Sequence, residues 1–394
     1  MRIALYHNLH SGGAKRVVNA QIASLATRHN IVVYSLVGAM PLSDTRIPVR
    51  TEIHRPMPMA RSPLGRINPL LRAVDILRLN ELARRLAARI DHDGFDVVLV
   101  HPCQVTQAPL VLRWLRTPTL YYCQELPRQH YEPSPVRSYY RRGPLASAVD
   151  TFDPLPKIHR AVIRIADRRS VVKAKTVAVN SRYSQANVHA AYGLQAHLCY
   201  LGVDSKAFNL LPRQRERTVL SVGALTPLKG FDFIIEAVAT IPAAERPQLL
   251  VISNYQEANE RAYLEELAAT RGVRLELRVG IPDTELQAAY ASAGCVAYAP
   301  VREPFGLVAL EAMAAGAPIV AVAEGGVAET VIDGETGLVV PREPFAFGSA
   351  LQALLAAPER AEWLGRAARH RAALVWTWER HISELERLLA LTVG

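Results

Sequence analysis

The 394-residue sequence has few cysteines and no long apolar run. Its four cysteines form no Cys-x-x-Cys pair, and each lies in or beside an apolar stretch: Cys103, Cys123, Cys199 and Cys295. We therefore expect buried free thiols and neither a disulfide framework nor a zinc site. No apolar run reaches the length of about eighteen residues that a membrane span requires, so we expect no transmembrane helix. The short apolar run before His7 lacks the features of a signal peptide and is interpreted as a first buried strand.

Positive charge is concentrated in the first half of the chain. Residues 1–200 contain 28 Lys and Arg against 12 Asp and Glu, a net charge of +16, whereas residues 201–394 carry −6. A basic half favours an anionic partner, which could be a phospholipid surface, a phosphorylated acceptor or nucleic acid. The alternative is a solvated arginine-rich surface without a partner. Basic and aromatic residues are interleaved over residues 128–142, but in no known nucleic-acid-binding module, so we expect no nucleic-acid partner.

Short β-branched runs alternate with amphipathic runs along the chain. The predicted strands are residues 3–6, 31–36, 97–100, 119–122, 176–179, 219–222, 249–252, 275–277, 295–299, 319–322 and 338–340. The predicted helices between them include residues 13–28, 68–90, 231–239, 259–271, 283–292 and 305–315. This alternation is typical of βαβ units and parallel sheets, so the predicted fold class is α/β.

The alternation restarts after a polar stretch, residues 212–217, which is interpreted as an interdomain linker. We predict two Rossmann-like doubly wound domains facing across a cleft, residues 1–210 and 211–375, with ligands outside the carboxyl ends of the strands. Residues 376–394 are expected to include a helix that packs back on the first domain. Residues 127–160 are rich in Pro, Arg and Tyr and too long for a plain connection, so they are predicted to be a lid, a binding loop or a disordered segment.

The segment from Glu303 to Pro318 carries the most specific signal for chemistry. Its glutamates, Glu303 and Glu311, lie eight residues apart across a predicted strand-to-helix turn. Gly306 would let a ligand approach the backbone closely, and the amides at the helix start favour a phosphate. Glu303 could accept hydrogen bonds from sugar hydroxyls and Glu311 from ribose hydroxyls. The alternative, two solvated carboxylates at helix ends, does not account for Glu303, Gly306 and Glu311 together after an apolar strand.

This segment resembles the Glu-x7-Glu signature of the family 4 retaining glycosyltransferases, which have the GT-B fold. The resemblance runs nearly end to end and is strongest over residues 219–340. Further segments that resemble family motifs are residues 11–13, 180–184, 201–204, 221–231, 325–329 and 333–340. The resemblance implies the GT-B arrangement of two Rossmann-like domains and a nucleotide-sugar donor.

The resemblance also implies which residues bind the donor. Lys229 would contact the diphosphate as a point charge, Gly280 and Ile281 would lie against the base, and amides near Gly13 would meet the diphosphate from the first domain. The predicted donor-binding residues are Gly13, Gly223, Lys229, Gly280, Ile281, Glu303, Pro304, Phe305, Gly306, Leu307, Val308 and Glu311.

Two positions depart from the family pattern. Ala224 stands where the family usually has an arginine, five residues before the lysine, so one diphosphate cation is missing and Arg302 or Lys15 would have to substitute. Gln124 stands where the family often has a histidine facing the sugar, and an amide cannot exchange protons in an acid/base role. The resemblance implies that the leaving phosphate accepts the proton of the acceptor. The protein then needs only to position the reactants and to stabilise the leaving diphosphate.

The predicted catalytic residues are Glu303 and Lys229 in the second domain and Gln124 and His101 in the first. For His101 the alternative is a histidine with a purely structural role at a strand end. No His-x3-His spacing is present, and Lys229 together with helix N-termini would neutralise the diphosphate. We therefore expect neither a metal ion nor a cofactor.

The sequence thus predicts a metal-independent retaining hexosyltransferase of cell-envelope or polysaccharide biosynthesis. It would move a hexose from a UDP- or GDP-sugar to a lipid-linked, glycan or other hydroxyl acceptor. One alternative is a GT-B relative with epimerase or phosphorylase chemistry, although nothing indicates a lysine that binds pyridoxal. The other is a non-catalytic sugar-nucleotide-binding homologue, which the residues at positions 124 and 224 make conceivable.

Two stretches concentrate the basic charge of the first half. Residues 61–89 interleave arginines with aliphatic residues, and residues 128–142 interleave arginines with tyrosines. Such a composition suits the headgroup region of an anionic bilayer. We therefore expect a cytoplasmic enzyme bound peripherally at the inner face of the plasma membrane and acting on a lipid-linked acceptor. The alternative is that the aliphatic residues pack on the domain core and leave a solvated basic face.

Overall fold

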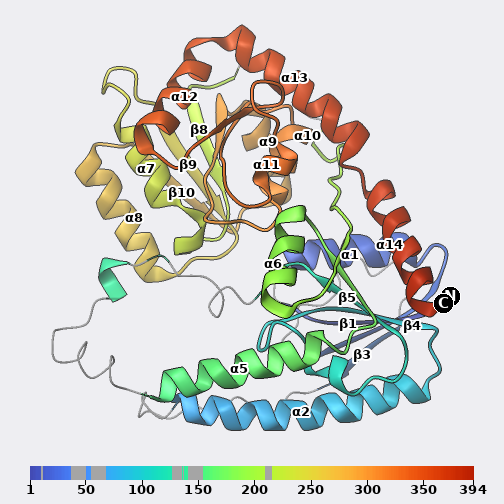
Figure 1. Ribbon diagram of the computed structural model, residues 1–394. Coiled ribbons are helices and arrows are strands. Elements are labelled where there is room, and N and C mark those ends of the chain that lie inside the picture. The colour runs from blue at the N-terminus through green and yellow to red at the C-terminus, as the bar shows by residue number, and fades with distance from the viewer. Residues whose placement is uncertain are drawn as a thin grey trace. The chain divides into compact units, whose positions relative to one another are not determined.

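The computed structural model describes residues 1–9, 12–36, 50–54, 68–126, 135, 137–140, 154–208 and 215–394. The chain divides into two compact units. The first contains Met1–Pro133, Arg141–Cys199 and Ile382–Gly394, and the second contains Ser134–Tyr140 and Tyr200–His381. Each unit is built around its own parallel sheet (Figure 1).

The described residues of the first unit form a seven-stranded parallel sheet in the order β3-β2-β1-β4-β5-β6-β7. Its strands are β1 (Arg2–Asn8), β2 (Asn30–Leu36), β3 (Arg50–His54), β4 (Val97–Cys103), β5 (Thr119–Cys123), β6 (Thr176–Val179) and β7 (His197–Leu198). Its main helices are α1 (Gly13–Leu25), α2 (Asn68–His92), α5 (Leu155–Val171) and α6 (Arg182–Tyr192). The order places β1 inside the sheet, between β2 and β4, and its residues 3–8 are buried.

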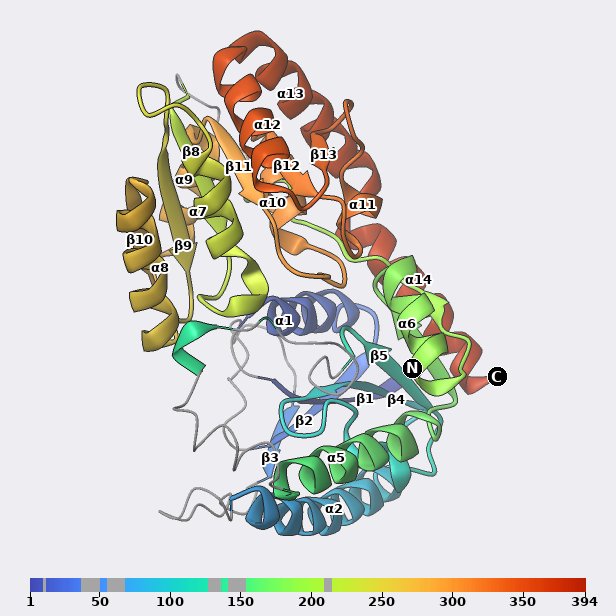
Figure 2. The same cartoon turned by 60° about the vertical axis from the view of Figure 1, so that its left-hand side comes forward.

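In both views α2 and α5 lie side by side on one face of the first sheet, with α1 on the other (Figures 1 and 2). The face under α2 and α5 is sealed by one apolar cluster, in which Leu86 and Ile90 of α2 and Ile163 of α5 contact the strands. Residues 3–6 of β1 and 97–100 of β4 are buried, continuous apolar runs rather than alternating ones, as expected for parallel strands covered on both faces.

The described residues of the second unit form a six-stranded parallel sheet in the order β10-β9-β8-β11-β12-β13. Its strands are β8 (Thr218–Val222), β9 (Gln248–Ser253), β10 (Leu275–Val279), β11 (Cys295–Tyr298), β12 (Ile319–Val322) and β13 (Leu338–Val340). Its helices include α7 (Phe231–Ala239), α8 (Ala258–Arg271), α9 (Asp283–Ser292), α10 (Leu307–Ala314), α11 (Val327–Thr330), α12 (Pro344–Ala356) and α13 (Pro358–Val375). Both strand orders reverse direction beside the first strand of the unit, as in doubly wound folds.

The unit boundary differs in position from the predicted one. The chain passes from the first unit to the second between Cys199 and Tyr200, before the boundary predicted at residues 210 and 211. The reason is local packing: the amide of Val203 donates to the carbonyl of Trp376 at 2.9 Å, which ties this stretch to the second unit. Residues 209–214, which include half of the predicted linker, lie outside the described part of the chain.

The C-terminal helix α14 (Trp378–Val393) spans the last change of unit, because Ile382–Gly394 belong to the first unit. Glu386 lies 2.8 Å from Nε2 of His29, and the Thr392 hydroxyl donates to the Thr176 hydroxyl at 2.8 Å. The four cysteines are free and buried, as predicted. Within the described residues, none of the helices combines the length and the apolar composition that crossing a membrane requires.

Part of the predicted irregular segment, residues 127–160, is helical. Helix α5 begins at Leu155, after Pro154, and Pro156 stands within its first turn, where a proline costs the helix no hydrogen bond. The prediction of an irregular structure is therefore wrong from residue 155 onwards. Most of the remaining segment lies outside the described residues, apart from residues 135, 137–140 and 154.

Candidate functional site

The site predicted around Gly306 is formed by the loop between β11 and α10. Gly306 precedes α10 with a φ of 101°, and a Cβ there would lie 3.2 Å from the ring of Tyr298. Both observations require glycine. No side chain caps α10, so the amides of Leu307 and Val308 start the helix and are suited to hold a phosphate. The helix begins at Leu307, two residues later than predicted.

Phe305 explains the later start of the helix. Its side chain is 2% exposed and packs against two aromatic rings, with centroids 6.1 Å from that of Tyr200 and 5.8 Å from that of Trp376. Phe305 therefore anchors the loop, and only its backbone is available to a donor. Sequence alone did not distinguish this anchoring role from direct contact.

Lys229 and Glu303 are brought together by the fold. The Lys229 Nζ lies 3.0 and 2.9 Å from the two carboxylate oxygens of Glu303, and the side chains are 26% and 18% exposed. Lys229 ends the short helix Pro227–Lys229, and its aliphatic part lies against Gly223, where a Cβ would come within 3.3 Å of Cγ. The sequence predicted both residues at the donor but not their ion pair. The arrangement presents one cation and one carboxylate side by side at partly exposed positions.

Glycines let the segments that carry Lys229 and Glu303 pack closely against neighbouring backbone. Gly230 has a φ of 68°, and a Cβ on it would lie 2.1 Å from the carbonyl oxygen of Ala299. The amide of Gly326 donates to the carbonyl of Glu303 at 2.8 Å, and a Cβ on Gly326 would lie 2.1 Å from the carbonyl oxygen of Pro304. The loop that carries Glu303 is therefore packed against the turn at Gly326, which accounts for the glycine pair in the sequence.

The other predicted donor residues lie near the same edge of the second sheet. Gly223 follows β8, Gly280 follows β10 and Glu303 follows β11, all at carboxyl ends of parallel strands. A Cβ on Gly280 would have no neighbour within 4 Å, which leaves open space at its Cα, and Ile281 beside it is half-buried. Glu311 is buried and accepts a hydrogen bond from the Tyr290 hydroxyl at 2.9 Å. Tyr290 is a partner that the sequence did not indicate.

The predicted residues of the first unit also meet one another. The Gln124 side-chain nitrogen lies 3.3 Å from Nδ1 of His101 and 3.3 Å from the carbonyl oxygen of Ala14, in the first turn of α1. The backbone carbonyl of Gln124 accepts from the Asn180 side chain at 2.9 Å. His101 is fully buried at the end of β4, and Gly13 opens α1. Asn180 belongs to a segment that resembles a family motif, which was the one signal for its presence here.

Lys15 occupies an unusual environment beside this cluster. It is 3% exposed, and its Nζ lies 3.1 Å from Nε2 of His7. Burial lowers the pKa of Lys15 to about 8, and burial together with the charge of Lys15 lowers the pKa of His7 to about 3. Arg302, the other predicted substitute for the missing arginine, is exposed, and its amide lies 3.4 Å from a Glu324 carboxylate oxygen.

The described residues contain no cluster of potential metal ligands that would be an alternative to this site. The chain has one Asp-x-Asp sequence, Asp91–Asp93, but its carboxylates are engaged elsewhere: Asp91 accepts from the amide of Thr117 at 2.9 Å and Asp93 from Arg89 at 3.0 Å. No group of three or more potential metal ligands occurs within the described residues.

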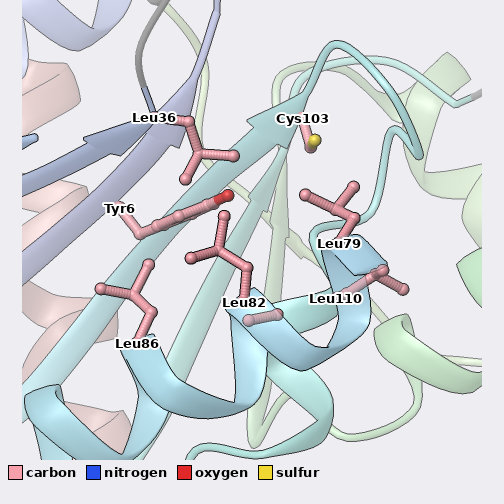
Figure 3. A pocket seen from close by; sticks show the side chains of 8 residues that line it. Tyr6, Leu36, Leu79, Leu82, Leu86, Cys103 and Leu110 are labelled. Atoms are coloured by element: carbon pink, nitrogen blue, oxygen red, sulfur yellow. The ribbon is translucent and has the colours of Figure 1, made fainter. Parts of the chain in front are cut away.

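Figure 3 shows a small, mainly apolar pocket between the first sheet and α2, into which Tyr6 and Leu82 point. Its lining lacks charged groups that could bind a nucleotide.

The chain matches known proteins in sequence. The family model described as glycosyl transferases group 1 matches residues 203–371. A GDP-mannose-dependent alpha-(1-6)-phosphatidylinositol monomannoside mannosyltransferase from Mycolicibacterium smegmatis is 36% identical over 253 residues, 58% of this chain and 65% of that protein. A D-inositol 3-phosphate glycosyltransferase from Acidothermus cellulolyticus is 30% identical over 319 residues, 71% of this chain and 70% of that protein. The chain thus spans just under two thirds of the first relative and somewhat more of the second.

The fold is similar to that of solved structures. Sucrose-phosphate synthase from Thermosynechococcus elongatus superposes with a TM-score of 0.77, covering 99% of this chain and 98% of that one at 22% identity. This likeness confirms the predicted α/β fold class of two Rossmann-like domains, the GT-B fold. The residues matched by the family model include the loop of Glu303 and the turn of Lys229. The chain belongs to the family of group 1 glycosyl transferases.

Proposed function

We propose that the chain is a retaining hexosyltransferase that uses a UDP- or GDP-sugar and a hydroxyl acceptor. The observation that carries the proposal is the Lys229–Glu303 ion pair beside the uncapped start of α10. A cation and helix amides suit a diphosphate, and an adjacent carboxylate suits sugar hydroxyls. The names of two relatives make GDP-mannose the first donor to test and inositol-containing or lipid-linked molecules the first acceptors.

The proposed roles divide between leaving group and sugar. Lys229 and the amides of Leu307 and Val308 stabilise the charge that develops on the leaving diphosphate. Glu303 orients the sugar through its hydroxyls, and Glu311 accepts from the ribose. Because Gln124 cannot take a proton, the leaving phosphate accepts the proton of the acceptor hydroxyl, and the protein contributes position and electrostatics.

A second candidate function is a sugar-nucleotide-binding protein without turnover. Ala224 removes a cation where the family usually has one, and Gln124 replaces a histidine. The ion pair at Lys229 would serve binding equally well, so binding alone does not separate the two functions. Turnover of the donor does.

The test is a donor screen that measures released UDP or GDP, with and without EDTA. We expect one nucleotide-sugar to be turned over in the presence of acceptor, with the anomeric configuration of the sugar kept in the product. Activity should survive EDTA, because a lysine and helix amides take the place of a bridging metal ion. Binding of a donor without any turnover would favour the second function. Activity lost in EDTA and restored by magnesium or manganese would contradict the metal-independent site.

We further propose that the enzyme works in the cytoplasm, at the surface of an anionic membrane, through the outer face of α5. Three apolar side chains seven residues apart are exposed there: Ile158 and Ile165 of α5 and Val172, its C-cap residue, are 49%, 51% and 46% exposed. Five exposed basic residues surround them, namely Lys157, Arg160, Arg164, Arg168 and Arg169. The one acidic residue of α5, Asp167, is buried and accepts from Tyr192 at 2.7 Å. Exposed aliphatic residues within cationic surroundings favour a bilayer headgroup region.

This surface differs from the one predicted from sequence. In α2, Leu86 and Ile90 are buried in the core, whereas Leu77 is 70% exposed. In the second predicted stretch, Arg137 is buried and therefore adds nothing to a basic surface. Residues 61–67, 128–134, 136, 141 and 142 lie outside the described residues.

Neutralising two arginines of α5, Arg164→Gln with Arg169→Gln, should weaken binding to phosphatidylglycerol vesicles. At about 1 kcal/mol for each basic residue near the surface, the loss is about 2 kcal/mol, roughly 30-fold in partitioning. Sedimentation with anionic and neutral vesicles at low salt measures it. The matched control is Arg360→Gln with Arg366→Gln, two exposed arginines of α13. Equal, negligible binding of the wild type to both vesicles would rule out the membrane proposal and favour a soluble acceptor.

A further inference from the structure

A short segment of the chain is packed into the donor-binding unit although its neighbours in sequence belong to the first unit. Residues Ser134–Tyr140 belong to the second unit, whereas Met1–Pro133 and Arg141–Cys199 belong to the first. Within this segment, Arg137 is only 4% exposed, and a short helix follows at Ser138–Tyr140. An arginine is seldom buried without partners, because removing its charge from water is costly.

The partners of Arg137 come from three elements of the second unit. Its Nε and Nη2 both lie 3.0 Å from Glu260 carboxylate oxygens, on α8. Its Nη1 and Nη2 donate to the two oxygens of Asp232, on α7, at 2.8 and 3.0 Å. Nη2 also lies 3.3 Å from the carbonyl oxygen of Pro227. Two forked carboxylate contacts and one carbonyl use the whole planar guanidinium, which a lysine could not reproduce.

Two tyrosines complete the cluster. The Tyr139 hydroxyl donates to the second oxygen of Glu260 at 2.5 Å. The ring of Tyr263 lies under the guanidinium of Arg137, with 5.2 Å from its carbon to the ring centroid, and packs edge-on against Tyr139. Glu260 is fully buried, so its charge depends on Arg137 and Tyr139 for compensation.

The cluster lies immediately around the lysine of the donor site. Pro227 precedes Lys229 by two residues, in the same short helix, and Asp232 follows it by three, in the first turn of α7. Arg137 thus holds the backbone before Lys229 and the helix after it. Arg137 makes no hydrogen bond with the side chain of Lys229 in this cluster, and that side chain pairs with Glu303.

We propose that Arg137 is a positioning residue for the donor site, and that residues 137–139 act as a clasp that fixes the turn carrying Lys229. This inference rests on the proposed function, because it assigns Lys229 to the donor diphosphate. The clasp works through Pro227 and Asp232, and no contact between Arg137 and the donor is required. A misplacement of about 1 Å in such a turn can cost roughly 100-fold in rate.

The test compares Arg137→Ala and Arg137→Lys with Arg271→Ala in the full chain. Arg271 pairs with Glu236 at 2.8 Å and links the same two helices, α8 and α7, away from Lys229. For Arg137→Ala we expect UDP or GDP affinity, and kcat/KM for the donor, to fall at least tenfold, with KM for the acceptor unchanged. Arg137→Lys should recover only part of the loss, and Arg271→Ala should bind nucleotide like the wild type.

A double variant separates positioning from stability. Arg137→Met with Glu260→Leu removes the buried charge together with its partner, so the melting temperature should recover towards the wild-type value. Under the proposal, nucleotide affinity stays at least tenfold weak, because Pro227 and Asp232 are still released. Recovery of affinity together with stability, or unchanged affinity in Arg137→Ala, would overturn the clasp. A wild type that binds neither UDP nor GDP would instead contradict the proposed function.

Discussion

Replacing Lys229 with alanine is expected to weaken nucleotide binding by tenfold or more. The loss of one charge-assisted hydrogen bond costs about 1.5–3 kcal/mol, which corresponds to roughly 10- to 150-fold in affinity. The structure adds a second reason: Glu303 lies 2.9 Å from Lys229 and would lose its counter-charge. Without Lys229 beside it, the negative charge of Glu303 would repel a diphosphate more strongly.

Calorimetry with UDP and GDP measures the effect of Lys229→Ala. Lys206→Ala is a matched control, because Lys206 is the other lysine of the second unit and is exposed. Glu311→Ala should also weaken binding, through loss of the ribose contact. The donor-site assignment fails if Lys229→Ala and Glu311→Ala both bind nucleotide with wild-type affinity.

The second large effect is expected from Gly230→Ala. Alanine at a φ of 68° costs about 1–2 kcal/mol, and the added Cβ would lie 2.1 Å from the carbonyl oxygen of Ala299. Relieving such an overlap costs about 1–3 kcal/mol more. We therefore expect the free energy of unfolding to fall by roughly 2–5 kcal/mol. Because Gly230 follows Lys229 directly, the displaced turn should also weaken nucleotide binding.

Gly334→Ala is the control for the backbone term. Gly334 has a φ of 71°, and a Cβ there would have no neighbour within 4 Å, so only the cost of about 1–2 kcal/mol remains. Denaturant unfolding and nucleotide titration of both variants separate the two contributions. Equal losses of unfolding free energy in Gly230→Ala and Gly334→Ala would show that the contact with Ala299 adds nothing to the destabilisation.

The strands that were predicted correctly are those whose burial can be recognised from their apolar sequence. Residues 97–100 of β4 and 319–322 of β12 are short, continuous apolar runs, and parallel strands covered on both faces require this composition. Strands β3 and β7 were missed, because they lie at the sheet edges and carry charged or polar residues such as Arg50 and His197. Helix α5 was missed because its prolines were interpreted as signs of a loop.

The candidate site divides in the same way. Gly306, Glu303 and Lys229 were found because a local motif contains them. The pairing of Lys229 with Glu303 joins residues 74 positions apart, and that of Arg137 with Glu260 joins residues 123 apart. Such contacts depend on how the sheet is assembled, which no local pattern encodes. Arg137 was therefore attributed to a basic surface, although the structure buries it between two carboxylates.

The four places where the chain changes unit limit how this protein can be recombined with its relatives. The second unit consists of Ser134–Tyr140 and Tyr200–His381, and the first unit ends with Ile382–Gly394. In a chimera joined at residue 200 alone, Glu260 and its partner at position 137 would come from different proteins. The first sheet and the last helix that belongs to its unit would also come from different proteins. Exchanging the second unit for that of a relative therefore requires that residues 134–140 be exchanged with it and that the final thirteen residues be kept.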